Sequence, residues 1–122
     1  MVKAEQRKRA ERFGRSAESW AILYLRLKGY CILGTRLKMR GGEIDVVARR
    51  GDITIFVEVK ARQTAAGLDQ AYEAVNQKRI IQAANHWLSQ NPQYADTTIR
   101  FDVIGLAPLA WPMHIVDAFQ IN

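Results

Sequence analysis

The stretch GEIDVVARRGDITIFVEVK at residues 42–60 decides the fold and holds the main chemical signal. It predicts two strands, at residues 43–48 and 53–61, joined by a tight turn. Side chains alternate along a strand, so Glu58 and Lys60 point to the same face. The opposite face of this strand is wholly apolar and predicts burial beneath a helix. Its residues are Ile53, Ile55, Val57 and Val59.

The length of the turn decides whether Asp45 shares the face of Glu58. A two-residue turn centred on residues 51–52 sets Asp45 directly opposite Glu58. A two-residue turn centred on residues 50–51 pairs Asp45 with Phe56 instead, which also leaves it on that face. A three-residue turn would direct Asp45 to the other face.

Two facing carboxylates on neighbouring strands predict a cation between them. Directly opposite Cβ atoms lie about 4.5–5.5 Å apart, a distance at which like charges are destabilising. A few carboxylates, with water and substrate phosphate, are the usual ligands of Mg²⁺. Lys60 beside the ion would orient or deprotonate an attacking water, or offset charge on a phosphate. The alternative is a solvated edge strand carrying Glu58 and Lys60, with Asp45 paired to an arginine.

The 122 residues, 48% hydrophobic and 25% charged, predict a soluble chain with one core. We expect residues 1–11 to form a basic leader, partly disordered, and residues 12–122 to form a single domain. No apolar run approaches the ~20 residues that span a bilayer, and the charged N-terminus lacks the apolar segment of a secretion signal. The lone Cys31 excludes an internal disulfide, fits a cytoplasmic location, and is expected to pack in a strand.

The net charge of +6 is unevenly distributed. Residues 1–50 carry 13 Lys and Arg against 5 Asp and Glu, whereas residues 51–122 carry 5 against 7. A basic half favours a polyanionic partner such as nucleic acid, although the leader alone would serve equally as a solvated tail. Five basic residues near the acidic hairpin are expected where a phosphate backbone would lie: Arg36, Lys38, Arg40, Arg49 and Arg50.

Hydrophobic periodicity predicts a first helix at residues 11–28, stopped by Gly29. Its predicted apolar stripe comprises Phe13, Ala17, Trp20, Ala21, Tyr24 and Leu27. The remaining predicted elements are a strand at 30–39, a helix at 70–89, and strands at 99–106 and 114–121. The order αβββαββ predicts an α/β (mixed α+β) fold with a central, mixed five-stranded sheet flanked by helices.

Five motifs along the chain resemble those of a known family. They are F-G-R-x-A-E-x-x-A at 13–21, G-Y-x-I-L at 29–33, G-E-I-D at 42–45, F-V-E-V-K-x-R at 56–62, and R-F-D-V-I at 100–104. Over roughly residues 12–120 the chain resembles the YraN-like family of the restriction-endonuclease-like PD-(D/E)xK superfamily, which is similar to archaeal Holliday junction resolvases. Ile44 stands where the superfamily motif has proline.

The resemblance implies an Mg²⁺- or Mn²⁺-dependent nuclease core acting on structured or branched DNA. Asp45 and Glu58 match the two metal-binding acids, and the backbone carbonyl of Val59 matches a further metal ligand. Lys60 matches the catalytic lysine. Glu18 matches a first-helix acid beside the metal, which would make it both a catalytic residue and a metal ligand.

Further residues are candidates for contacts around that site. Arg62 continues the face of Glu58 and Lys60, and Lys78 lies at the edge of the second helix's apolar stripe. Both are candidate nucleic-acid contacts, with a solvated surface position as the alternative. Glu43 is a candidate outer-shell acid. By analogy with the resolvases, a domain this small is expected to form a homodimer.

Two other functions remain open at the level of sequence. One is a non-catalytic nucleic-acid-binding module that keeps the fold, and the other is a protein-interaction domain with a basic surface. For Glu18 the alternative role is an ordinary ion pair with Arg15 or Arg26.

Four further polar or aromatic positions are predicted to be structural: Asp102, His86, His114 and Trp111. Asp102 lies within an apolar strand and is expected to pair with Arg100 or Arg36. The two histidines have neither ligand spacing nor an acid–nucleophile partner. Trp111 is expected to pack in the core.

Overall fold

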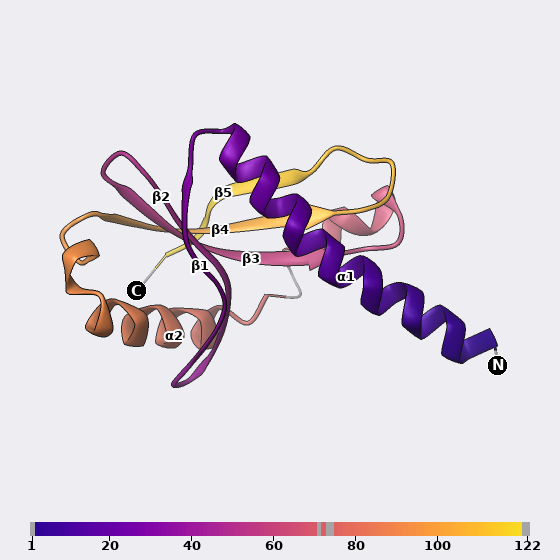
Figure 1. Cartoon of the computed structure of the whole chain (residues 1–122), viewed down its shortest axis with the longest axis horizontal. Helices are drawn as coiled ribbons and strands as arrows, with labels where there is room; N and C mark the ends of the chain where they lie inside the picture. Colours follow the sequence, from indigo (N-terminus) through magenta and orange to yellow (C-terminus); the bar gives the residue numbers. More distant parts are fainter. Residues whose placement is uncertain (1, 71, 73–74, 121–122) are drawn as a thin grey trace.

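The computed structural model describes residues 2–70, 72 and 75–120. The predicted order αβββαββ is confirmed, with short 3₁₀ segments added (Figure 1). The elements are α1 (Val2–Leu27), β1 (Cys31–Met39), β2 (Gly42–Arg50), β3 (Ile53–Ala61), η1 (Ala65–Gln70), α2 (Gln77–Gln90), η3 (Pro92–Tyr94), β4 (Thr98–Leu106) and β5 (Met113–Phe119).

The five strands form one mixed sheet in the order β1-β2-β3-β4-β5. Neighbouring strands are antiparallel except for β3 and β4, which run parallel. The crossover between these two strands carries η1 and α2, as a parallel connection requires. The predicted mixed five-stranded sheet is therefore confirmed.

The turn between β2 and β3 is the two-residue turn centred on residues 51–52. Arg50 pairs with Ile53, and the pairing continues to Val46 opposite Val57. Gly51 adopts a φ of 60°, which is typical of hairpin turns of this length. The pairing ends one residue short of Asp45 and Glu58, the next two residues in this register.

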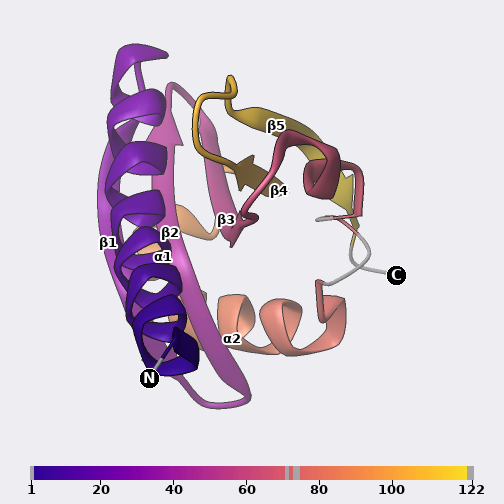
Figure 2. The same cartoon turned by 90° about the vertical axis from the view of Figure 1, so that its right-hand side faces the viewer.

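The two long helices cover opposite faces of the curved sheet (Figure 2). Small residues of α1, Ala17 and Ala21, let the helix approach the buried β3 residues Ile55 and Val57. The predicted burial of this apolar face is thus confirmed. On the other face, α2 buries Ile80, Ala83, Ala84 and Trp87 in a second cluster that includes Phe56 and Phe101.

Helix α1 differs from its prediction at its start and on its apolar face. It begins at Val2 instead of residue 11, and its N-terminal half extends past the sheet (Figure 1). Trp20 and Leu27 are 59% and 80% exposed, so the predicted apolar stripe was wrong at these positions. The alanines and Leu25 face the sheet instead, because only a narrow stripe fits there. The side chain of Phe13 lies outside the described residues.

Helix α2 begins at Gln77 instead of residue 70. The side chain of Asn76 accepts a hydrogen bond from the Arg79 N–H, which caps the helix at this point. Residues 65–70 form a 3₁₀ helix instead. Residue 121, the predicted end of the last strand, lies outside the described part of the chain.

Two residues predicted to be packed are exposed. Cys31 begins β1 but faces solvent. Trp111 lies in the connection between β4 and β5 and is 91% exposed, because this connection runs over the surface. Among the described residues, no helix is long and apolar enough to cross a membrane.

Candidate metal-binding active site

Asp45, Glu58 and Lys60 line one polar cavity of about 370 Å³. Backbone pairing between β2 and β3 is recorded only as far as Val46 and Val57, so the cavity lies where the two strands cease to pair. The first turn of α2 closes its other side with Asn76, Arg79 and Ile80. The structure therefore brings together the three residues of the predicted hairpin site.

Asp45 carries its charge at an energetic cost. Its Oδ2 accepts a hydrogen bond of 2.8 Å from the Val59 N–H. Burial raises the pKa of Asp45 to about 7, with repulsion from Glu58 as the second cause and a smaller one from Glu18. The hydrogen bond from the Val59 N–H lowers the pKa of Asp45, but by less than burial and repulsion raise it. A carboxylate whose pKa is raised in this way, in a polar cavity, is a candidate binding group.

The backbone of Val59 faces the same carboxylate. The N–H and C=O of one strand residue point to the same edge of the strand. Because the Val59 N–H reaches Asp45, its carbonyl lies on the β2 side as well. This orientation suits the ligand role that the family resemblance implies.

The positively charged side chain of Lys60 contacts Glu58. Its Nζ lies 3.3 Å from Glu58 Oε1, and the two side chains are 23% and 17% exposed. Lys60 therefore balances one of the two hairpin carboxylates and stands beside the position that a substrate phosphate would take.

Glu18 reaches the same end of the sheet from α1. Its carboxylate forms an ion pair with Arg36 of β1. The side chain of Arg15, one of the two alternative partners, lies outside the described residues. The hydrogen bond with Glu18 raises the pKa of Arg36, with smaller effects from Glu43 and Asp45. Arg36 therefore lies over the acidic residues, where its contact with Glu18 offsets part of their charge.

The donor set fits a hard divalent cation. Two carboxylates and a backbone carbonyl supply oxygen ligands only, which is the chemistry that Mg²⁺ prefers. Among the residues that the structure describes, no three His, Cys, Asp or Glu side chains are grouped closely enough to hold a metal. Because Glu18 is paired with Arg36, the residues that could hold such an ion are Asp45, Glu58 and the Val59 carbonyl.

Two residues of the cavity were not predicted from the sequence: Asn76, which directly precedes α2, and Arg79 in the first turn of α2. Asn76 and Arg79 line the cavity, whereas the predicted phosphate contact Lys78 is exposed and does not. Asparagine before an amphipathic segment is a helix-start signal that would have placed Arg79 in the first turn. Glu43, predicted as an outer acid, also lines the cavity.

The other basic residues divide between those near the cavity and those far from it. Lys38 and Arg40 are exposed toward the end of β1. Arg62 donates to the Ala61 carbonyl and does not line the cavity. Arg49 and Arg50 lie at the opposite end of β2, roughly 15 Å along the strand from Asp45. The expectation that these two border the hairpin acids was wrong.

Another carboxylate of the sheet, the fully buried Asp102, is fully paired. Arg100 donates to both of its oxygens at 2.9 Å, which confirms one of the two expected partners. His114 Nε2 lies 2.8 Å from the same carboxylate, a contact with an acid that the sequence did not indicate. The Asp117 N–H supplies a further hydrogen bond of 3.0 Å. The other histidine, His86, accepts from the Arg40 N–H.

Comparisons with known proteins identify the family. A model of the uncharacterised protein family UPF0102 matches residues 17–106, so the chain belongs to this family. The UPF0102 protein of Methylocella silvestris is 45% identical over 122 residues, covering 100% of this chain and 98% of the relative. The UPF0102 protein of Bradyrhizobium diazoefficiens is 48% identical over 99% of this chain and 91% of its own. The matched region contains the hairpin acids, Lys60, Glu18 and Arg79.

Proposed function

We propose that this chain is a divalent-metal-dependent nuclease of the PD-(D/E)xK superfamily that hydrolyses phosphodiester bonds of structured or branched DNA. The observation that carries the proposal is the pair of carboxylates, Asp45 and Glu58, with one lysine beside them. Burial and mutual repulsion raise the pKa of Asp45 to about 7. A stabilising role alone would not favour such a pair, whereas a cation-binding role requires it.

Each residue of the cavity has a role in this proposal. Asp45, Glu58 and the Val59 carbonyl would hold Mg²⁺ or Mn²⁺. The bound ion would supply Lewis-acid stabilisation of charge on the phosphoryl group and promote ionisation of water. Lys60, held by Glu58, would orient the attacking water and offset charge on the phosphate.

The first turn of α2 would bind the phosphate that reacts. Arg79 lines the cavity, and its guanidinium can donate two parallel hydrogen bonds to phosphate oxygens. The free backbone N–H groups of a helix N-terminus favour an anion at the same place. Lys38 and Arg40 would contact the DNA backbone farther out, while Arg36 exchanges between Glu18 and phosphate. The proposed enzyme is a homodimer in the cytoplasm.

The test is a cleavage assay with branched, single-stranded and duplex DNA and RNA, each with Mg²⁺ and with Mn²⁺. We expect Asp45→Ala to lower the cleavage rate at least ~1,000-fold, the scale of losing a main catalytic group. DNA binding should persist or strengthen, because a charge that repels phosphate is removed. The control is Asp52→Asn, which changes an exposed acid in the turn of the same hairpin.

The outcomes separate the three functions. Equal cleavage by the wild type and Asp45→Ala would exclude the catalytic assignment. Binding that falls steeply with salt, without cleavage of any substrate, would indicate a nucleic-acid-binding module. Absence of salt-dependent binding to DNA and RNA would indicate a protein-interaction domain.

A further inference from the structure

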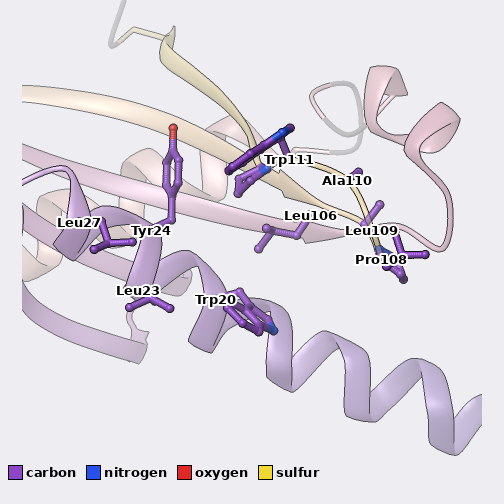
Figure 3. Close-up of a pocket in the computed structure, with 11 residues that line it drawn as sticks. Trp20, Leu23, Tyr24, Leu27, Leu106, Pro108, Leu109, Ala110 and Trp111 are labelled. Atoms are coloured by element: carbon purple, nitrogen blue, oxygen red, sulfur yellow. The ribbon is translucent and has the colours of Figure 1, made fainter.

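An exposed apolar surface lies away from the residues that line the acidic cavity. Helix α1 and residues 106–112 border a groove of about 420 Å³ whose lining is aliphatic and aromatic (Figure 3). Trp20, Leu23 and Leu27 of α1 are 59%, 45% and 80% exposed around it. Residues 106–112 add Leu109 and Trp111, 108% and 91% exposed. We call these five residues the apolar patch.

The area of the apolar patch exceeds what a solitary protein usually exposes. Its two tryptophans and three leucines together expose roughly 600–800 Å², given ~150–250 Å² for a large aromatic side chain. The largest patch on a typical monomer is about 300–600 Å². Two such patches brought together would bury about 1,200–1,600 Å², which is the size of a standard stable interface.

The outer face of α1 has the spacing of a packing seam. Trp20, Leu23 and Leu27 recur at intervals of three and four residues and are exposed on the side of the helix that does not face the sheet, while Tyr24 between them packs partly against the core. The inner side already packs Ala17, Ala21 and Leu25 on the sheet. A helix that is apolar on both sides is normally covered on both sides.

The loop beside the groove holds its large side chains outward. Leu109 has a φ of 60°, a conformation that is rare and costly for a bulky residue. This backbone leaves Leu109 fully exposed at the loop tip, while Trp111 projects from the same loop (Figure 3). The patch therefore contains both a groove and the projecting side chains that would fill a groove of the same kind.

We propose that a second copy of this chain covers the apolar patch in a two-fold symmetric dimer. A two-fold interface uses one surface twice, so that surface must contain both halves of the contact. The groove and the projecting Leu109 and Trp111 meet that condition, and the doubled area reaches the size of a stable interface. This inference identifies the surface through which the homodimer of the proposed function would form. It rests on the proposed function only for the expectation that the chain is a homodimer.

The arrangement also connects the interface to the acidic cavity. Glu18, which contacts Arg36 above the site, lies on α1 close to Trp20. A partner seated against Trp20 and Leu27 fixes the helix that carries Glu18. The dimer therefore holds α1 between the sheet of one copy and the surface of the other.

The test is the molecular mass of the purified full chain, measured by light scattering and sedimentation without DNA or divalent metal. We expect twice the 13.9 kDa of one chain at about 50 μM, where a micromolar dimer is populated. Trp111→Ala should raise the dimer dissociation constant at least ~30-fold, as loss of a central aromatic contact does. Leu27→Glu should give a monomer of unchanged circular dichroism, because Leu27 is 80% exposed.

A matched control and a crosslinking experiment identify the surface. Val116→Glu changes an apolar residue that is 50% exposed on β5 and does not border the groove, so dimerisation should persist. In a Cys31→Ser background, Leu109→Cys should crosslink between copies with a short bis-maleimide, and Val116→Cys should not.

Two results would overturn the inference, and neither depends on catalysis. One is a wild-type chain that stays monomeric, including a monomer that binds lipid vesicles or another protein through the patch. The other is a dimer that survives both Leu27→Glu and Trp111→Ala. An inactive enzyme that still dimerises would reject the proposed nuclease and keep the interface.

Discussion

Two aspartates in the central sheet are withdrawn from water, yet their pKa values are displaced in opposite directions. Asp102 is 0% exposed, and burial alone would raise its pKa, but hydrogen bonds from His114, Arg100 and the Asp117 N–H hold it below the usual range. Asp45 receives one backbone hydrogen bond and faces Glu58, and its pKa rises to about 7.

The two aspartates differ in how far the protein itself stabilises their charge. The charge of Asp102 is balanced by the protein itself, so nothing external is needed. In the described part of the chain, every buried polar side-chain atom has a hydrogen-bond partner. Asp45 has no comparable set of donors among the described residues, and its raised pKa favours the protonated form over the charged one. The two acids therefore differ in the direction of the pKa shift, and the cause of the difference is the number of hydrogen bonds that each carboxylate receives.

The largest effect on stability is expected from Asp102. Asp102→Ala should lower the free energy of unfolding by about 3–5 kcal/mol, because it leaves Arg100 without its partner in a largely buried position. Urea unfolding at pH 7 measures the loss. The matched variant Asp45→Ala should show no comparable loss, and a loss below about 1 kcal/mol for Asp102→Ala would contradict the comparison.

Removing the charge of Asp45 should raise the free energy of unfolding, by less than the loss of Asp102 lowers it. The folded-state pKa of Asp45, about 7, lies above the unfolded value of 3.8, so the folded chain retains a proton that the unfolded chain releases. Wild-type stability should therefore fall as the pH rises from about 4 to 7. Asp45→Asn lacks this penalty and should be about 2 kcal/mol more stable than wild type at pH 8, after allowance for screening by water.

The measurement is urea unfolding of wild type and Asp45→Asn between pH 4 and pH 8. The difference in unfolding free energy between the two proteins should be near zero at pH 4 and grow as the pH rises to 8. A constant difference at all pH values would show that ionisation of Asp45 is not its cause.

The smallest change in unfolding free energy is expected when Mg²⁺ or Mn²⁺ is added. Mg²⁺ or Mn²⁺ at ten times its dissociation constant should stabilise the wild type by about 1.4 kcal/mol at pH 8. The gain should shrink at pH 6, because the ion must then displace the proton on Asp45. Thermal unfolding with and without the ion measures it. Asp45→Asn should show no gain, while Asp52→Asn should keep it; equal gains in both would place the ion elsewhere.

The hairpin was predictable because its periodicity and turn are local properties. Alternation along β3 places Glu58 and Lys60 on one face. Both of the two-residue turns that the sequence left open put Asp45 on that face as well. The order of elements and the mixed sheet also followed from periodicity. The choice of register, and the placement of Asn76 and Arg79 beside the acids, required the fold.

The errors have physical causes that lie beyond the local sequence. The apolar spacing of α1 could not show which stripe faces the sheet, because the helix has two; Trp20 and Leu27 were assigned inward and lie outward. Trp111 was assigned to the core because a large apolar residue is usually buried. The start of α2 was placed too early because the capping role of Asn76 was missed.

The sequence by itself determined the strand alternation, the hairpin, the number of strands and the uneven charge, since these depend on residues near one another in the chain. Only the tertiary structure decided that Glu18 reaches Arg36, that Arg79 rather than Lys78 borders the cavity, and that Asp102 is compensated whereas Asp45 is not. The physical reason is that desolvation and Coulomb interactions depend on distances between segments far apart in sequence, which alternation and propensity do not fix.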